Sequence, residues 1–272
     1  MAQNDKLHIG DSQDKDWALH GSRYLFLDGV NDYVKFSNTL AGQNWGFWLN
    51  HSKDWSMCFT IRNLVNPFYD NIFWATENAA FQENNPLRVG QPFLWISSYY
   101  TQTSEAGTQF ANNFNSWIIA FLYALRANKF LQFFYSFNAA TKGVDLYVNG
   151  VYVNTLQALF ISNNHNRNLF NFQCVTIANA NAGGFFNSRF IQMDLLQFMV
   201  TNNYITNRED VHELYHAKLD RSKYPTSVSA NRLCDLAIDT QVPSGSMIIP
   251  DLMSNTTATI FGQGTSDYRL IT

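Results

Sequence analysis

The chain has 272 residues, of which only 14% are charged, and its formal net charge is −3. It has no concentration of Lys and Arg, as a nucleic-acid-binding protein needs, and no apolar run approaches the ~20 residues of a membrane-spanning helix. Hydrophobic residues make up 46% and aromatic residues 16%, which is enough for the core of one large all-β domain.

The first segment, residues 1–22, is polar, carries mixed charges and has almost no apolar periodicity. We expect it to be an N-terminal arm that orders only against a neighbouring subunit. The candidate apolar anchors for that docking are Trp17, Leu19 and the adjoining Tyr24. The N-terminus also lacks the apolar stretch of a signal peptide. Residues 23–272 are expected to form a single domain.

Short apolar or alternating runs separated by turn residues predict antiparallel strands along most of that domain. The strongest signal is Asn149-Gly150, the preferred pair for a type I′ hairpin turn, between two runs rich in Val and Tyr. The apolar runs 117–123 and 130–136 have a composition that also suits a helix, but their length and aromatic content favour strands. The expected strand segments are 24–27, 33–36, 55–62, 71–75, 93–97, 117–123, 130–136, 143–154, 170–177 and 188–199.

One helix is predicted near residues 207–219, with Thr206 as its N-cap and Glu209 closing a capping box. The segment 209–213 is rich in acids and contains a histidine, which suggests a metal site. Acidic residues in the first turn complement the helix dipole, however, and we favour that explanation. Residues 221–272 hold short apolar runs that are expected to return to the sheets as strands.

Three segments in this order resemble a known family. They are residues 25–36 (LFLDGVNDYVKF), residues 145–152 (DLYVNGVY), and residues 191–198 leading into 205–211. Together they are similar to the laminin-G-like branch of the concanavalin-A-like lectin/glucanase superfamily. The resemblance implies an all-β protein, an antiparallel jelly-roll β-sandwich with one short capped helix.

The same fold hosts lectins, hydrolases and adhesion modules, so it does not fix a function. Similar domains occur on tailed-phage particles as fibres, receptor-binding parts or capsid decoration. Together with the polar arm and the Asn-rich composition, this favours a non-enzymatic structural and binding module located in a virion. Its expected partners are other virion proteins, further copies of the chain and a host-surface glycan, without nucleic acid or membrane insertion. The alternative is a secreted lectin or a glycan-active hydrolase of the same fold.

Glucanases of this fold carry two glutamates around an aspartate on one strand, which supply the acid and the nucleophile. Here the corresponding residues are Gln192, Asp194 and Gln197. An amide can neither attack an anomeric carbon nor donate the required proton. We therefore expect no glycoside hydrolysis at this strand and no catalytic residue elsewhere.

Calcium is the one cofactor with a candidate site, because Asp28, Asn31 and Asp32 offer closely spaced oxygen ligands. An Asx turn explains the same residues more simply, and we favour it. The three cysteines are odd in number and far apart, so no disulfide framework is expected.

Aromatic faces beside amides are the groups that a sugar site uses, since rings stack on a pyranose while amides bond its hydroxyls. Two loop-like stretches combine them, although the same groups suit a protein contact or core packing under a loop. The candidate ligand-contact residues are Trp45, Trp48, Tyr99, Tyr100, Asn112 and Asn113.

Overall fold

The computed structural model describes most of the strands of the domain and one residue of the N-terminal arm. The described residues are 17, 23–49, 52–63, 71–76, 92–97, 101–105, 109–111, 129–159, 174–180, 189–190, 192–239, 247–262 and 268–270.

The larger sheet has nine strands, and its neighbouring strands all run antiparallel. Eight of them follow one path, in the order β20-β1-β16-β5-β10-β11-β12-β9, and β17 pairs with β16 beside that path. Their bounds along the path are Tyr268–Leu270, Arg23–Asp28, Gln192–Thr201, Trp55–Arg62, Leu131–Asn138, Gly143–Val148, Val151–Leu159 and Gln109–Ala111, with β17 at Arg232–Asp235.

The smaller sheet has seven antiparallel strands in the order β18-β19-β2-β13-β6-β7-β8. Their bounds in that order are Ile248–Ile249, Ala258–Phe261, Tyr33–Phe36, Cys174–Ile177, Asn71–Thr76, Pro92–Ser97 and Thr101–Glu105. Two short ribbons complete the strands: β3 (Thr39–Leu40) with β4 (Gln43–Asn44), and β14 (Asn179–Ala180) with β15 (Arg189–Phe190).

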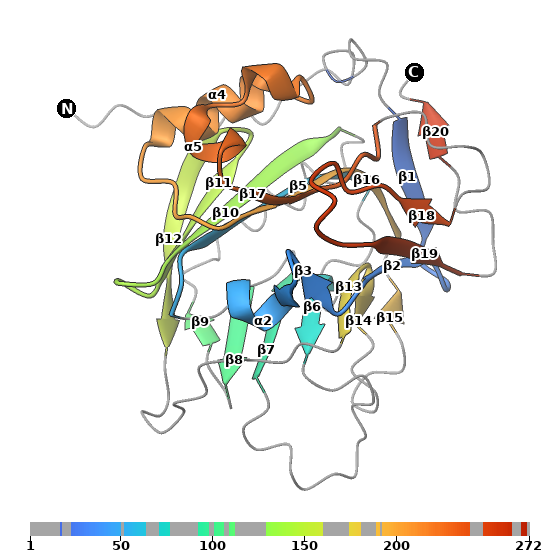
Figure 1. Ribbon diagram of the computed structural model, residues 1–272, viewed down its shortest axis with the longest axis horizontal. Coiled ribbons are helices and arrows are strands. Elements are labelled where there is room, and N and C mark those ends of the chain that lie inside the picture. The colour runs from blue at the N-terminus through green and yellow to red at the C-terminus, as the bar shows by residue number, and fades with distance from the viewer. Residues whose placement is uncertain are drawn as a thin grey trace, which may run out of the picture.

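The two sheets stack as layers with the main core between them (Figure 1). Phe198 of β16 lies near its middle, with ring centroids 5.2 Å from Phe36, 5.1 Å from Phe59 and 5.8 Å from Phe73. These aromatic residues come from strands of both sheets, so their burial holds the layers together. The arrangement confirms the predicted antiparallel jelly-roll sandwich.

The predicted hairpin is present between β11 and β12. Asn149 and Gly150 have φ angles of 52° and 78°, the positive values that a type I′ turn requires at both central positions. Asn149 Oδ1 also accepts a hydrogen bond of 2.9 Å from the backbone N of Gln132 on the neighbouring strand. The turn is therefore fixed by its own backbone and by the sheet beside it.

The predicted helix is α4, Arg208–Ala217, but its cap differs from the prediction. Asn207, not Thr206, is the N-cap, and its side chain accepts a hydrogen bond from the backbone N of Glu209. The cap lies one residue later because Asn207 has the extended backbone of a cap and an oxygen within reach of that amide. With Asn207 as the cap, Asp210 takes the place predicted for Glu209, and Asn207 Nδ2 donates to Asp210 Oδ1 at 2.7 Å.

Two shorter helices follow α4: the 3-10 helix η2 (Arg221–Lys223) and α5 (Thr226–Ser229). With α4 they cover the outer side of the larger sheet (Figure 1). The strands β17, β18, β19 and β20 all lie in the C-terminal 221–272 segment and join the two sheets. The predicted strand at 117–123 lies outside the described residues.

Candidate functional site

Asp194, the acid that remains of the glucanase pattern, lies on the outer face of the larger sheet and is almost fully buried. Its Oδ2 accepts hydrogen bonds of 2.8 Å from both Arg62 Nε and Asn63 Nδ2. The Arg62 guanidinium lies 4.6 Å from the ring centroid of Tyr24 and 4.3 Å from that of Phe130. Asp194 is thus the anion of a buried ion pair covered by aromatic rings, and not an accessible acid.

Gln197, at one glutamate position of the pattern, is fully buried on the same face. Its Oε1 accepts a hydrogen bond from Thr60 Oγ1 at 2.9 Å, and its Nε2 donates to the Tyr224 hydroxyl at 2.9 Å. That hydroxyl in turn donates to the backbone O of Lys218 at 3.2 Å. The Gln197 amide therefore links the helical layer, formed by α4, η2 and α5, to the larger sheet. Of the three pattern residues, only Gln192 keeps partial exposure.

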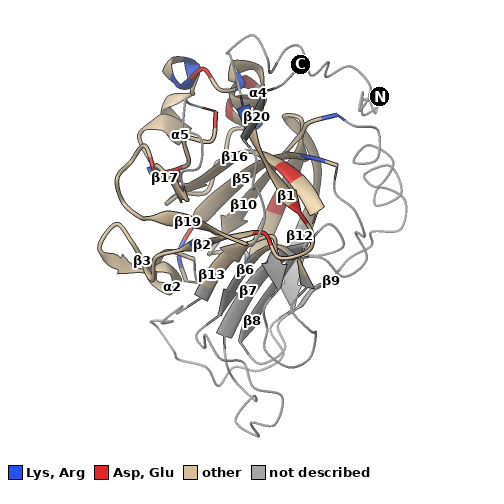
Figure 2. Ribbon diagram, turned by 90° about the vertical axis from the view of Figure 1, so that its right-hand side faces the viewer, with Lys and Arg blue, Asp and Glu red and all other residues tan. Residues whose placement is uncertain are grey.

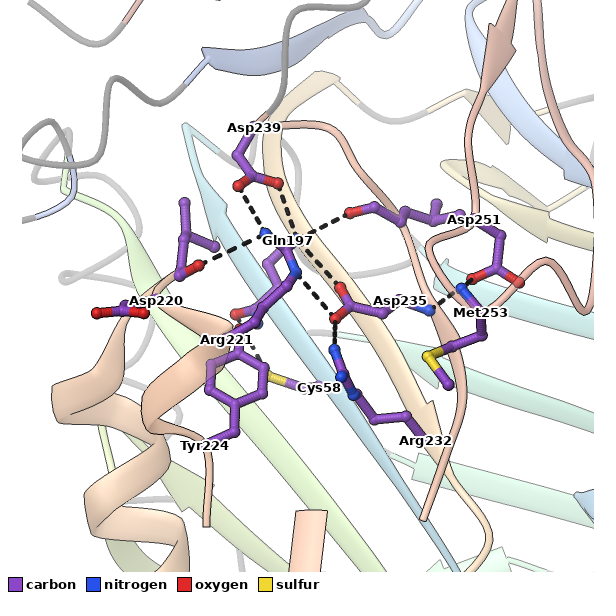
Figure 3. A network of polar contacts seen from close by, with 12 residues as sticks. Cys58, Gln197, Asp220, Arg221, Tyr224, Arg232, Asp235, Asp239, Asp251 and Met253 are labelled. Carbon is purple, nitrogen blue, oxygen red and sulfur yellow. Dashed lines mark hydrogen bonds and ion pairs between the residues drawn. The ribbon is translucent and has the colours of Figure 1, made fainter. Parts of the chain in front are cut away.

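A larger polar network lies beside Gln197, under η2 and along β17 (Figure 3). Arg221 makes two 2.8 Å bonds to the carboxylate of Asp239 and bonds of 3.0 and 3.1 Å to that of Asp235. Arg232 adds a 2.6 Å bond to Asp235, whose backbone N donates to Asp251 Oδ1 at 2.9 Å. Burial alone would lower the pKa of Arg221, but the hydrogen bonds that Arg221 donates to Asp239 and Asp235 outweigh burial and raise that pKa.

This Arg221–aspartate network was not foreseen from the sequence, because its members lie in three separate segments without a spacing pattern. Arg221 and Arg232 form ion pairs with Asp235 and Asp239, and the network joins η2 to β17. Its chemistry is that of a structural clamp, since a bidentate Arg–carboxylate pair favours fixed geometry. The buried thiols nearby fit the same interpretation: burial, followed by the charge of Asp235, raises the pKa of Cys58 well above its usual value.

The calcium candidates lie in the turn between β1 and β2. Asp28 Oδ1 accepts hydrogen bonds from the backbone N of Val30 at 2.8 Å and of Asn31 at 3.3 Å, which is an Asx turn. Asp32 is buried, and its Oδ2 accepts from the backbone N of Asp28 at 3.4 Å. In the part of the chain that the structure describes, no three His, Cys, Asp or Glu side chains converge as metal ligands. Calcium binding stays a prediction.

The expected docking anchors of the arm pack inside the chain itself. Trp17 is fully buried and forms one cluster with Tyr24, Phe130, Leu196 and Leu219. Both side chains are buried within the chain, and the anchoring of the arm on another subunit by Trp17 and Tyr24 stays a prediction. Leu19 lies outside the described residues.

The first aromatic stretch was expected to be a loop, and the structure makes it a single helical turn, α2 (Trp45–Trp48). Trp45 points inward: it is fully buried, and its Nε1 donates to the backbone O of Ser37 at 2.9 Å. Its indole belongs to the core in this structure, and the ligand contact by Trp45 stays a prediction. Trp48 is only half-buried, and its Nε1 donates to the backbone O of Leu40 at 2.8 Å.

Trp48 belongs to a small exposed group that we call the α2 surface, formed by Gln43, Asn44, Phe47, Trp48 and Lys53. Phe47 is half-buried, and its ring centroid lies 4.9 Å from that of Trp48 at 89°. Lys53 Nζ lies 3.0 Å from the Phe47 centroid and 5.2 Å from that of Trp48. The amides of β4, Gln43 and Asn44, are exposed directly before the helix. Figure 2 shows β3 and α2 at the edge of the molecule.

Only Trp48 was foreseen among these five residues. The aromatic pair of Phe47 and Trp48 is visible in the sequence, but Lys53 lies outside that stretch, and only the folded structure shows its Nζ over the Phe47 ring. The other predicted contacts, Tyr99, Tyr100, Asn112 and Asn113, lie outside the described residues. Among the described helices, none has the length and apolar character needed to cross a membrane.

No protein-family model matches this chain, and no curated protein matches it in sequence. Solved structures do resemble it. A proposed carbohydrate-binding protein from Bacteroides ovatus has 12% identity and a TM-score of 0.50, and the match covers 89% of this chain and 59% of that one. The chain thus spans about three fifths of that protein.

Two further structures have lower TM-scores. The CBM40 of the Ruminococcus gnavus IT-sialidase has 9% identity and a TM-score of 0.41, with 70% of this chain and 95% of that one covered. The heptameric SAP-like pentraxin from Limulus polyphemus has 10% identity and a TM-score of 0.39, with 72% and 82% covered. At such identities the likeness to the Bacteroides ovatus protein shows a lectin-like sandwich fold and nothing finer.

Proposed function

We propose that this protein is a non-enzymatic carbohydrate-binding module and that the α2 surface is a glycan contact. The observation that carries the proposal is the partly exposed Phe47–Trp48 pair with two exposed amides beside it. The ring faces suit the apolar side of a pyranose, and Gln43 and Asn44 can both donate to and accept from sugar hydroxyls. Lys53 adds ammonium donors at the same place. The fold shared with a proposed carbohydrate-binding protein supports the idea.

The hydrolase alternative finds no accessible acid pair among the described residues of the glucanase-like strand. Asp194 is paired with Arg62 under aromatic rings, and Gln197 is bonded to Tyr224 beneath the helices. Retaining hydrolysis needs two carboxyl groups about 5–5.5 Å apart that reach the sugar. We expect no release of reducing sugar from common polysaccharides, compared with a heat-treated control. Release that disappears in Asp194→Asn would support an enzyme instead.

The binding proposal is tested with the fluorescently labelled chain on a glycan array, followed by titration calorimetry with the best oligosaccharide. Phe47→Ala is expected to weaken binding about 3- to 10-fold, the worth of one aromatic contact. Gln43→Ala with Asn44→Ala is expected to weaken it further. Phe261→Ala is the matched control, because it removes an exposed phenylalanine from β19. Equal affinities of Phe47→Ala and the control would show that the α2 surface is not the glycan contact. An array without any bound glycan would contradict glycan binding as a whole.

The virion setting is a separate proposal that rests on the family resemblance and on the polar composition. Mass spectrometry of purified phage particles from a host that encodes the chain is its direct test. Detection in the particles at a stoichiometry comparable to known structural proteins would support a virion component. Its absence from particles, with the protein found in the culture medium, would favour a secreted lectin.

A further inference from the structure

Two histidines lie one turn apart on the exposed side of α4. His212 and His216 both point away from the sheet, whereas Val211 and Leu214 of the same helix are buried against it. The two rings meet edge to face at 63° with their centroids 4.3 Å apart, and the distance from His212 Nε2 to His216 Nε2 is 3.1 Å. The sequence analysis considered His212 for a metal site within 209–213 but favoured the helix-dipole explanation, and it gave His216 no role.

The 3.1 Å separation fits two ligands of one metal ion. Imidazole nitrogens bind Zn²⁺ at about 2.0–2.1 Å, so two of them on one ion lie about 2.8–3.4 Å apart for angles between 90° and 109°. The observed distance falls inside that interval without any movement of the helix. A direct N–H···N hydrogen bond has a similar length, and both arrangements require at least one unprotonated nitrogen facing the other.

The surroundings keep this pair suitable for a cation. Neutral imidazole is the form that binds metal. Glu209 Oε1 lies 3.5 Å from His212 Nδ1, on the far side of the ring from His216. A proton held there by the carboxylate leaves Nε2 with its lone pair free, and a carboxylate beside the other ring nitrogen is common at histidine metal ligands.

We propose that His212 and His216 bind one divalent first-row transition metal ion, with Glu209 orienting His212 and water filling the remaining positions. Imidazole ligands suit Zn²⁺, Ni²⁺ and Cu²⁺, whereas Ca²⁺ prefers oxygen. The site is independent of the glycan proposal, because α4 and the α2 surface are separate elements that share no residue. The binding ion is expected to stabilise α4 in place, since only the folded helix sets the two rings side by side.

The test uses the tag-free full chain, titrated with Zn²⁺ by calorimetry and heated with and without Zn²⁺. We expect saturation at one ion per chain and a melting temperature that rises with Zn²⁺ but not with Ca²⁺. His212→Gln and His216→Gln should each weaken binding at least about 10-fold, and Glu209→Gln should weaken it by a smaller factor. His165→Gln is the matched control, a histidine elsewhere in the sequence, and should bind as the unaltered chain does.

Unchanged affinity in both His212→Gln and His216→Gln would overturn the site, as would a loss of equal size in His165→Gln. Both ligand side chains are exposed, so the variants should fold, and circular dichroism checks this. Should either variant unfold, Cu²⁺ broadening of the histidine ring signals in the unaltered chain decides the question. The strongest broadening must fall on His212 and His216, and broadening centred on other histidines rejects the proposal.

Discussion

Along β5, both faces of the larger sheet are buried, but different interactions stabilise them. On β5 every residue is buried: Met57, Phe59 and Ile61 face the smaller sheet, while Cys58 and Thr60 face the helical layer. The inner face is apolar and depends on area removed from water and on packing. On the outer face, Thr60 Oγ1 and Gln132 Nε2 both donate to Gln197 Oε1, and Gln197 Nε2 donates to the Tyr224 hydroxyl. The alternation of side chains along a strand therefore predicts which residues share a face, but it does not predict whether the polar face is exposed to solvent.

The largest expected effect tests the inner face. Phe198→Ala removes the ring that contacts Phe36, Phe59 and Phe73, and leaves a cavity between the sheets. We expect a loss of about 3–5 kcal/mol in the free energy of unfolding, measured in urea. Phe261→Ala is the control, since that ring is 39% exposed and should cost less than about 1.5 kcal/mol. Equal losses would mean that the inner face is not the principal core.

The second prediction concerns the clamp above the outer face. Arg221→Ala leaves Asp235, whose side chain is 0% exposed, without its bidentate partner. Since 18% of the Arg221 side chain is exposed, we expect about 2–4 kcal/mol, below the full cost of breaking a buried pair. Lys223→Ala on the same short helix removes an exposed pair with Asp220 and should cost less than about 1 kcal/mol. An equal loss of unfolding free energy in Arg221→Ala and Lys223→Ala would contradict the contrast between the two faces.

A third, smaller effect tests whether hydrogen bonds, in addition to burial, stabilise the outer face. Gln197→Met keeps the length of the side chain but removes the acceptor for Thr60 and the donor for Tyr224. We expect a loss of about 1–3 kcal/mol, because buried partners are left without a hydrogen bond. Gln43→Met on exposed β4 should stay within about 0.5 kcal/mol. Improved stability in Gln197→Met would show that the outer face behaves as an apolar core.

The smallest effect is a pH dependence in the covering helix. The pKa of His216 is lowered in the folded chain by burial and by His212 and Lys218, with Glu209 opposing them. The unfolded chain therefore binds more protons as pH falls below the ordinary value near 6.5, and stability decreases in that direction. His216→Gln should flatten the change in urea midpoint between pH 7.5 and 5.5, whereas His51→Gln should not. An unaltered slope in His216→Gln would assign that pH dependence to other groups.

Much of the fold follows from the sequence, because it depends on local patterns. The Asn149-Gly150 turn and the alternation of 55–62 are properties of adjacent residues, and both predictions are confirmed. The position of the cap was missed by one residue, since Thr206 and Asn207 are both good caps and only the backbone decides between them.

The candidate site was harder to foresee because it depends on side-chain direction and on distant partners. Trp45 and Trp48 stand three residues apart in the same stretch, yet one is fully buried and the other half-exposed. The bonds of Arg221 to Asp235 and Asp239 join segments with no shared pattern. The proximity of His212 and His216 follows from helical spacing, and it was missed because His212 was considered only together with the acids of 209–213.

The antiparallel pairing of β1 with β16 has a consequence for synthesis on the ribosome. Leu25 pairs with Leu195, about 170 residues later in the chain. At roughly 5–20 residues per second, the first strand waits about 10–30 s before its partner has been made. During that time β1 has only unpaired edges, and the neighbouring apolar strands of the nascent chain have no completed sheet to cover them. Protection of nascent chains by chaperones, rather than the stability of the finished sandwich, would then limit how much protein a cell produces.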